Sequence, residues 1–247
     1  MKKKTSVIIL AAGKGVRMKS ELPKVANKLA GTSLIERVVE TFRRFSVQDI
    51  FVVVGHKKEI VKDCLSSFTN IKFALQEPQN GTGHAVMMAE NFFSDFDGNV
   101  FVIPGDVPLL SSETLQNLEN LHNKEDASAT VLTAVLDDPA EYGRIVRNDE
   151  NFVEKIVEFR DANEDEKRIN EINSGIFCFK SEHLFSALKK IDNDNAQNEL
   201  YLTDTLEILK NEGKKIAAMI VQNPMEISGV NSQEQLAFLE NYIQKNN

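Results

Sequence analysis

Cysteine is scarce in this chain, and long apolar runs are missing from it. The 247 residues include two cysteines, Cys64 and Cys178, which give neither a disulfide framework nor a zinc cluster and which we expect to fill the core. No apolar run approaches the roughly 20 residues of a membrane-spanning helix. The apolar start of the chain resembles a signal peptide, but Gly13 and Lys14 interrupt it before a full apolar segment forms. We therefore expect a cytoplasmic protein.

Basic residues are fewer than acidic residues, and the sequence contains no linker-like segment. The chain has 29 Lys and Arg residues against 37 Asp and Glu residues, which gives a formal net charge of -8. This balance argues against a nucleic-acid or anionic-membrane partner, so any phosphate binding must come from a few placed cations. Lys14, Arg17 and Lys24 form such a local group. No linker-like or low-complexity stretch divides the chain, which suits one large α/β domain or a core with a smaller lobe.

An apolar, β-branched run at residues 7–10 leads into a basic, glycine-bearing loop, AAGKGVR, at residues 11–17. The pattern predicts a buried strand that delivers cationic backbone to its carboxyl end, where open α/β sheets bind their ligands. Two better-known phosphate signatures fail here. Met18 stands where a P-loop or a dinucleotide fingerprint starting at Gly13 requires a further glycine. The loop alone leaves two interpretations open: a nucleoside triphosphate site, or a strand-to-helix turn with solvent-facing charges.

Strand-like and helix-like runs alternate through the first half of the chain. The predicted strands are at residues 7–10, 50–54, 71–75 and 100–103, and the predicted helices are at residues 33–45, 59–68 and 84–93. Ser33 and Glu36 form a capping-box pattern at the start of the first helix. The alternation predicts right-handed βαβ crossovers and an α/β fold, with a Rossmann-like mixed, mostly parallel sheet flanked by helices.

The second half of the chain changes character. A hairpin pattern at residues 144–147 and 152–159 is followed by a strand at 171–179 and by helices near 200–211 and 233–244. We expect these segments to form a smaller mixed β lobe over the main sheet. The expected organisation is a single domain spanning residues 1–247, with halves at about 1–135 and about 136–231 and a C-terminal helix at 232–247.

Two polar residues stand next to predicted elements at the expected ligand edge. Asp106 follows the strand at residues 100–103, where an acid is either a hard-oxygen ligand for Mg²⁺ or a turn aspartate before Pro108. Asn231 precedes a helix and has Glu234 three residues later, which is an N-cap pattern. The side-chain carbonyl of Asn231 can face an ion while its backbone starts the helix.

Gln76 ends the third predicted strand at the same edge. Its amide is either a polar strand terminus or a paired donor and acceptor, which can match one carbonyl and the ring N–H of uracil. The neighbouring turn at residues 81–83, GTG, can let backbone approach a flat ring. Glu158, in the second half, is equally typical of an exposed strand residue.

A series of motifs runs almost from end to end of the chain. They are LAAGKGVRM at 10–18, LPK at 22–24, Gln76 with GTGH at 81–84, GDVPL at 105–109, YGR at 142–144, IVE at 156–158, EINSG at 171–175 and GVN at 229–231. In this order and spacing they resemble the nucleotide-sugar pyrophosphorylases, and within them the N-acetylglucosamine-1-phosphate uridyltransferases. Each motif is weak alone, but their joint order is specific.

The resemblance implies a nucleotide-diphospho-sugar transferase fold with the smaller lobe over a sugar site. It also implies an enzyme that converts UTP and N-acetylglucosamine 1-phosphate to UDP-N-acetylglucosamine and pyrophosphate, with Mg²⁺ as cofactor. The attacking phosphate oxygen is already anionic at neutral pH, so this reaction needs no nucleophilic side chain, general base or covalent intermediate. His56 and His84 receive no catalytic role.

The resemblance further assigns roles to individual residues. Catalytic roles fall to Arg17, Lys24 and Asp106, and the implied metal ligands are Asp106 and Asn231. The residues implied for nucleotide binding are Leu10, Ala11, Ala12, Gly13, Gly15, Lys24, Gln76, Gly81 and Thr82. The residues implied for sugar binding are Gly105, Gly143, Glu158 and Asn173.

Two other functions stay open at this point. One is a nucleotidyltransferase of the same fold that uses another nucleotide or another sugar 1-phosphate. The other is a non-catalytic nucleotide-sugar-binding regulator, which predicts loss of cations or metal ligands that are all present here. Bifunctional members of the family continue into a trimer-forming β-helix that transfers acetyl groups. No such repeat follows in this sequence, so we expect no acetyl transfer and a monomer or weak dimer, with no nucleic-acid or membrane partner.

Overall fold

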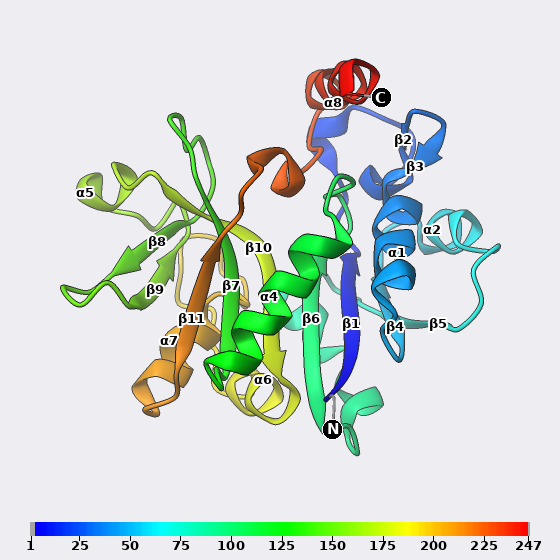
Figure 1. The fold of residues 1–247 in the computed structure, drawn as a ribbon. Helices are drawn as coiled ribbons and strands as arrows, with labels where there is room; N and C mark the ends of the chain where they lie inside the picture. Colours follow the sequence, from blue (N-terminus) through cyan, green and yellow to red (C-terminus); the bar gives the residue numbers. More distant parts are fainter. Residues whose placement is uncertain (1–2, 247) are drawn as a thin grey trace.

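A nine-stranded sheet forms the centre of the molecule (Figure 1). The structure is a computed structural model that describes residues 3–246. The strand order is β11-β7-β10-β6-β1-β4-β5, with β8 paired to β10 and β9 paired to β8. The strands are β1 (Lys4–Ala11), β4 (Ile50–Val54), β5 (Ile71–Leu75), β6 (Gly98–Pro104), β7 (Ala129–Val135), β8 (Arg144–Arg147), β9 (Val153–Val157), β10 (Glu171–Lys180) and β11 (Ile216–Ile220). A mixed sheet flanked by helices confirms the predicted fold class.

The strands β1, β4, β5 and β6 form the parallel part of the sheet. β1 lies between β6 and β4 and is parallel to both, and β5 is parallel to β4. β10 is antiparallel to its neighbours β6 and β7, whereas β11 is parallel to β7. The carboxyl ends of β6, β1, β4 and β5 therefore meet at one edge of the sheet, on the side where the C-terminal helix lies (Figure 1). Such an edge is where α/β sheets bind ligands.

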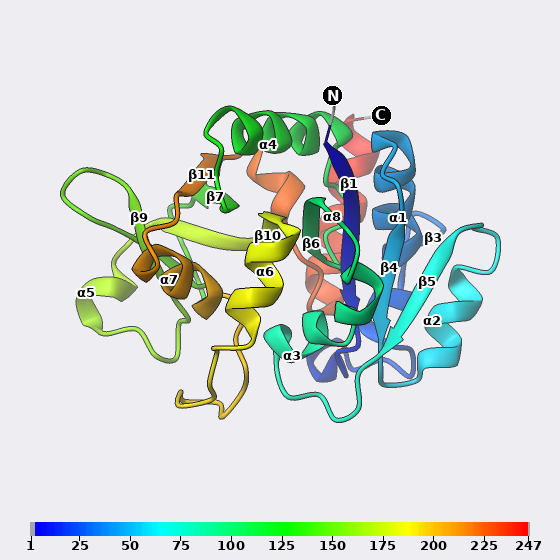
Figure 2. The ribbon, with the colours of Figure 1, turned by 90° about the horizontal axis from the view of Figure 1, so that it is seen from below.

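Helices cover both faces of the sheet (Figures 1 and 2). On one face lie α1 (Leu34–Phe45), α2 (Lys58–Cys64) and α4 (Ser112–Lys124), and on the other lie α3 (Thr82–Met87), α6 (Ser181–Leu188) and α7 (Asp204–Asn211). Side chains alternate along β1, so Val7 and Ile9 pack in the first core and Ile8 packs in the second. Burial of both faces explains why the strand is a continuous apolar run.

A third, smaller core holds the C-terminal helix against the loops at the carboxyl edge. Leu239 of α8 (Gln233–Asn246) is buried with Met18, Leu29 and Val230. Around this core lie β2 (Lys28–Leu29), β3 (Thr32–Ser33) and the short 3₁₀ turns η1 (Val16–Met18), η2 (Lys24–Ala26) and η4 (Pro224–Ile227). The remaining short elements are η3 (Glu90–Phe93) and α5 (Glu164–Lys167).

Some predicted boundaries were wrong. The helix expected at residues 84–93 is broken, because α3 ends at Met87 and the next residues form η3. The rings of Phe92 and Phe93 pack on Phe51 with centroids 5.0 and 4.7 Å apart, so tertiary packing decides the local conformation there. The helix expected at 59–68 ends earlier, at Cys64.

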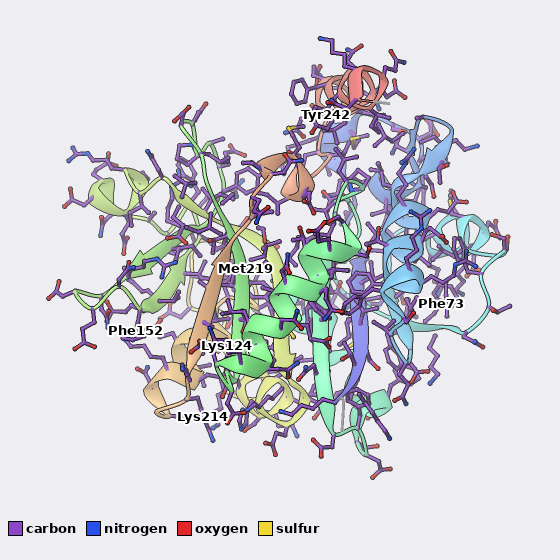
Figure 3. All side chains as sticks on the ribbon, viewed as in Figure 1. Phe73, Lys124, Phe152, Lys214, Met219 and Tyr242 are labelled. Atoms are coloured by element: carbon purple, nitrogen blue, oxygen red, sulfur yellow. The ribbon has the colours of Figure 1, made fainter. Side chains whose placement is uncertain are left out.

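The β8–β9 hairpin is part of the main sheet and forms no separate one. Its residue Arg144 pairs with Ile172 of β10, and its tip carries the exposed Phe152 (Figure 3). β10 has a register shift between Asn173 and Phe177, with β8 paired before it and β6 paired after it. The bulge separates β8 from β6 and opens the sheet next to the carboxyl end of β6.

Among the helices between residues 3 and 246, none is both long enough and apolar enough to cross a bilayer.

Candidate active site

The loop after β1 closely approaches Lys24. Gly15 has φ +63°, and a Cβ at this position would lie 2.6 Å from the Cβ of Lys24. A residue with a side chain would therefore push the loop away from η2, besides adopting an unfavourable left-handed conformation. Glycine at this position brings the cationic loop and Lys24 together.

Lys24 joins two of the residues expected to bind a metal. Its Nζ donates to Oδ2 of Asp106 over 2.6 Å and to Oδ1 of Asn231 over 3.1 Å. Asp106 is 6 % exposed, so its carboxylate lies largely out of water and needs a cationic partner. The backbone N–H of Val230 donates to the carbonyl of Asp106 over 3.0 Å and fixes the two segments side by side.

Arg17 completes the group. One guanidinium nitrogen donates to Oδ1 of Asn231 over 3.2 Å, and another pairs with Oε2 of Glu141 over 3.1 Å. The four residues Arg17, Lys24, Asp106 and Asn231 thus form one contact network, which we call the charged cluster. They come from three regions that are far apart in the sequence, residues 17–24, Asp106 and Asn231, and all four were predicted from the sequence.

The N-cap pattern predicted for Asn231 was wrong. α8 begins at Gln233, and Oγ of Ser232 accepts from the N–H of Gln235 over 3.3 Å. The backbone N–H of Asn231 donates to Oε1 of Gln235 over 2.7 Å. Because Ser232 caps the helix, the side chain of Asn231 faces the charged cluster.

A cavity of about 560 Å³ opens beside the charged cluster. Its size is typical of small-molecule sites. The lining includes every residue implied for nucleotide binding: Leu10, Ala11, Ala12, Gly13, Gly15, Lys24, Gln76, Gly81 and Thr82. Asp106 also lines the cavity, whereas Arg17 and Asn231 are outside its lining.

Gln76 has its amide nitrogen already engaged. The side chain is 3 % exposed, and Nε2 donates to the carbonyl of Gly81 over 2.9 Å and lies 3.2 Å from Nδ1 of His84. A carbonyl oxygen only accepts, so the NH₂ group must face Gly81. Oε1 then remains as the acceptor of this amide, and it makes no hydrogen bond within the described part of the chain.

Three of the residues implied for sugar binding lie together. The N–H of Asn173 donates to the carbonyl of Gly143 over 2.9 Å, and a Cβ on Gly143 would lie 3.4 Å from Oε2 of Glu158. They lie outside the lining of the large cavity. The fourth, Gly105, lies under the loop after β1, where its N–H donates to the carbonyl of Leu10 over 2.9 Å.

Thr203 links the two groups of residues and was not predicted from the sequence. It lines the large cavity, and its hydroxyl donates to Oε1 of Glu158 over 3.3 Å. Burial raises the pKa of Glu158, and the bond from Thr203 opposes that rise. Other lining residues missed from the sequence are Gln79, Phe177, Glu199 and Leu202. Residues 200–203 were expected to begin a helix, but α7 begins at Asp204, which leaves Thr203 in the turn directly before it.

Glu158 also faces a second pocket, of about 430 Å³, with several other acids. Asp204, at the start of α7, lines it together with Asp161, Asp192 and Glu207. Burial, with the neighbouring acids, raises the pKa of Asp204 to about 6. Like charges in a half-buried position therefore disfavour the ionised form of Asp204 in this pocket.

The donor set suits a hard cation that is shared with a substrate. No three His, Cys, Asp or Glu side chains cluster as a metal site within residues 3–246. Asp106 and Asn231 nevertheless offer two hard oxygens that meet at one point, the Nζ of Lys24. Mg²⁺ is commonly bound by one or two protein oxygens together with substrate phosphates and water. The residues therefore fit Mg²⁺ bound together with a phosphate substrate.

Comparisons with known proteins agree with this geometry. Residues 6–224 match the family described as "Nucleotidyl transferase". The sequence is 46 % identical over 238 residues to the bifunctional protein GlmU of Clostridium novyi (strain NT), covering 96 % of this chain and 52 % of that protein. It is 48 % identical over 236 residues to bifunctional protein GlmU of Clostridium perfringens (strain ATCC 13124), covering 96 % of this chain and 51 % of that one. The chain thus spans about half the length of the curated relatives it matches.

Solved structures show the same fold at low sequence identity. A UDP-glucose pyrophosphorylase complexed with UDP-glucose aligns over 100 % of both chains, with a TM-score of 0.77 and 19 % identity. A 4-diphosphocytidyl-2C-methyl-D-erythritol synthase from Anaerococcus prevotii aligns over 98 % of this chain and 96 % of that one, with a TM-score of 0.70 and 17 % identity.

Proposed function

The chain belongs to the nucleotidyl transferase family, and on that premise we propose that it transfers the uridylyl group of UTP to N-acetylglucosamine 1-phosphate. The family and the relatives support nucleotidyl transfer to a sugar 1-phosphate. The choice of UTP and N-acetylglucosamine 1-phosphate, the Mg²⁺ requirement and the mechanism are parts of the proposal. The observation that carries it is the charged cluster at the edge of the 560 Å³ cavity.

The proposed chemistry is a direct in-line attack by the sugar phosphate on the α-phosphorus of UTP, with pyrophosphate leaving. The attacking oxygen carries its own negative charge, so the protein must supply position and positive charge. Arg17 and Lys24, with the amides of residues 10–15, would neutralise charge that builds on the α-phosphate and the leaving group. When bound to Asp106 and Asn231, Mg²⁺ would neutralise further phosphate charge.

Gln76 is the residue that we expect to select uracil. Its free Oε1 can accept the N3–H of uracil, whereas cytosine has a lone pair at N3 and would face the same oxygen with a second acceptor. The paired donor and acceptor suggested by the sequence is thereby reduced to the acceptor, because Nε2 already donates to the carbonyl of Gly81 and lies 3.2 Å from Nδ1 of His84. An unmatched buried polar group costs about 1–3 kcal/mol, so UTP should be preferred over CTP by roughly tenfold to a hundredfold.

The sugar would be held by Gly143, Glu158 and Asn173. A carboxylate that accepts from two hydroxyls, next to backbone and amide groups, is ordinary sugar recognition. For the oligomeric state, a monomer or weak dimer stays a prediction, which light scattering would test.

The direct test is pyrophosphate release from each nucleoside triphosphate with a panel of sugar 1-phosphates. We expect the highest kcat/KM for UTP with N-acetylglucosamine 1-phosphate, and no release after chelation of divalent cations. Asp106→Asn tests the metal assignment directly, because it keeps the shape of the side chain but removes its negative charge. It should lower kcat by about 10²-fold or more. A higher kcat/KM for another nucleotide or another sugar 1-phosphate would contradict the proposed substrates. Full activity in excess chelator would refute the metal assignment.

A further inference from the structure

We propose that Lys24 occupies the two metal-ligand oxygens in the nucleotide-free protein, so that a divalent cation and the nucleotide must bind cooperatively. This inference rests on the proposed function, because it takes Asp106 and Asn231 as the metal ligands. It adds a second task for Lys24, which is to keep the site closed to the metal until a triphosphate arrives.

The ammonium group of Lys24 donates to one oxygen of each proposed metal ligand. Nζ of Lys24 lies 2.6 Å from Oδ2 of Asp106 and 3.1 Å from Oδ1 of Asn231. The side chain of Asp106 is 8 % exposed, so it has little contact with bulk water and the ammonium is its charged partner. A cation that binds Asp106 must therefore displace the ammonium or accept a second positive charge within a few ångströms, which is strongly unfavourable away from water.

Asn231 has no acceptor capacity left for a metal. An amide carbonyl has two lone pairs, and Oδ1 already accepts from Nζ of Lys24 and, over 3.2 Å, from Arg17. Entry of a metal requires at least one of these donors to leave. Lys24 is the donor that blocks both oxygens at once.

A triphosphate offers the alternative partner. Lys24 lines the 560 Å³ cavity, so phosphate oxygens bound there can take its ammonium. Once Lys24 pairs with phosphate, the oxygens of Asp106 and Asn231 are free for the cation. By linkage, the nucleotide then raises the affinity for the cation by the same factor as the cation raises the affinity for the nucleotide.

The test uses Mn²⁺ alone, without nucleotide, and measures free Mn²⁺ by electron paramagnetic resonance. Lys24→Met should bind Mn²⁺ about tenfold more tightly than the wild type, within the usual range of coupling between sites. The matched control is Lys14→Met, since Lys14 lines the same cavity and carries the same charge. Lys14 lies further from the metal ligands than Lys24, so the loss of its charge should change the Mn²⁺ affinity by less than about twofold.

Three results would overturn the proposal. The first is Mn²⁺ binding by Lys24→Met that is no tighter than binding by Lys14→Met. The second is a gain that persists after Asp106→Asn is added to Lys24→Met, because the cation would then be bound elsewhere. The third is Mn²⁺ binding by Lys24→Gln that is no tighter than binding by the wild type. Lys24→Gln removes the charge but keeps a donor for Asp106, and it serves as a second variant if Lys24→Met is unstable.

A separate measurement distinguishes this failure from failure of the proposed function. Metal-dependent pyrophosphate release by the wild type, together with no tighter Mn²⁺ binding by the Lys24 variants, would reject the competition and leave the function standing. Absence of uridylyl transfer by the wild type would reject the function itself.

Discussion

Gly15 determines how closely the first loop approaches Lys24. Its φ of +63° and the 2.6 Å separation predicted for an added Cβ leave room for glycine alone. The charged cluster depends on this approach, because η2 and the loop carry its two cations. A single absent side chain thus sets the geometry of the proposed chemistry.

We therefore expect Gly15→Ala to lower kcat by about 10²-fold, the usual effect of moving a catalytic group by about 1 Å. The matched control is Gly213→Ala, at a position that also has a positive φ (+73°) but where an added Cβ would meet no atom within 4 Å. It should retain kcat within a few-fold, as measured by steady-state pyrophosphate release. Equal losses in the two variants would contradict a specific role for the approach of the loop to Lys24.

Thr203 is a positioning residue for Glu158. Removing its hydroxyl in Thr203→Val should raise KM for the sugar phosphate roughly tenfold, the effect of losing a hydrogen bond to a charged group, with KM for UTP little changed. Burial already raises the pKa of Glu158, and loss of the Thr203 bond raises it further. The acid limb of kcat/KM for the sugar phosphate should therefore move to higher pH. Thr203→Ser should restore both values, and a change confined to thermal stability would make Thr203 purely structural.

At this scale the sequence predicted the charged cluster well and its surroundings poorly. The members of the cluster lie in motifs of fixed order, and their side chains do meet. Thr203 could not be predicted from the sequence, because its proposed role depends on a contact with Glu158, 45 positions away in the chain. The N-cap at Ser232 was not predicted, because Asn231 and Ser232 are both good capping residues. The contacts of Asn231 in the charged cluster decide between them.

Among the elements, β10 has the largest effect on the site. Its bulge, with Gly175 at φ +76°, lets the strand change its partner from β8 to β6. A Cβ on Gly175 would lie 3.1 Å from Cγ of Pro104, at the end of β6. The bulge therefore opens the sheet between the 560 Å³ cavity and the residues proposed for sugar binding.

The elements of the first half could be predicted because apolar runs and helical faces alternate there. α4 was missed because its buried face carries the polar Glu119 and His122 beside Leu115 and Leu118, which weakens the apolar pattern. β11 is short and rich in alanine, and it is placed by pairing with β7. These assignments depend on partners distant in the sequence.

α7 carries an acid that should destabilise the protein above neutral pH. The pKa of Asp204 is about 6 in the folded protein, against an ordinary value of 3.8, chiefly because of burial and then because of neighbouring acids. The folded state thus holds this proton more tightly than the unfolded chain. The stabilising contribution is complete below pH 3.8 and is lost as the pH rises through about 6.

Asp204→Asn should therefore raise the free energy of unfolding at pH 7.5 by about 1–2 kcal/mol, a figure reduced for partial exposure, and the melting temperature by a few degrees. Near pH 4 the variant and the wild type should converge. Asp149→Asn, in an exposed turn, is the control and should change stability little at either pH. Thermal melts at the two pH values decide the matter, and a destabilised Asp204→Asn at pH 7.5 would contradict the assignment.

The whole molecule places the 560 Å³ cavity and the residues proposed for sugar binding along one edge of a single sheet. The cavity proposed for the nucleotide lies at the carboxyl ends of β1, β5 and β6, and the residues proposed for the sugar lie just after β9, on β10 and in the loop before β8. The charged cluster stands beside the cavity, contributed by loops from both ends of the chain. This arrangement suits the direct reaction of two phosphate substrates without a covalent intermediate.

The most direct test of this account is isotope exchange between labelled pyrophosphate and UTP. Direct transfer predicts that label enters UTP when UDP-N-acetylglucosamine and Mg²⁺ are present, because the enzyme then runs the reaction in reverse. It also predicts that label does not enter UTP when the enzyme is given UTP, pyrophosphate and Mg²⁺ without any sugar compound. Exchange in the second mixture would show a uridylyl-enzyme intermediate, and absence of exchange in the first would show that this chain does not catalyse the proposed reaction.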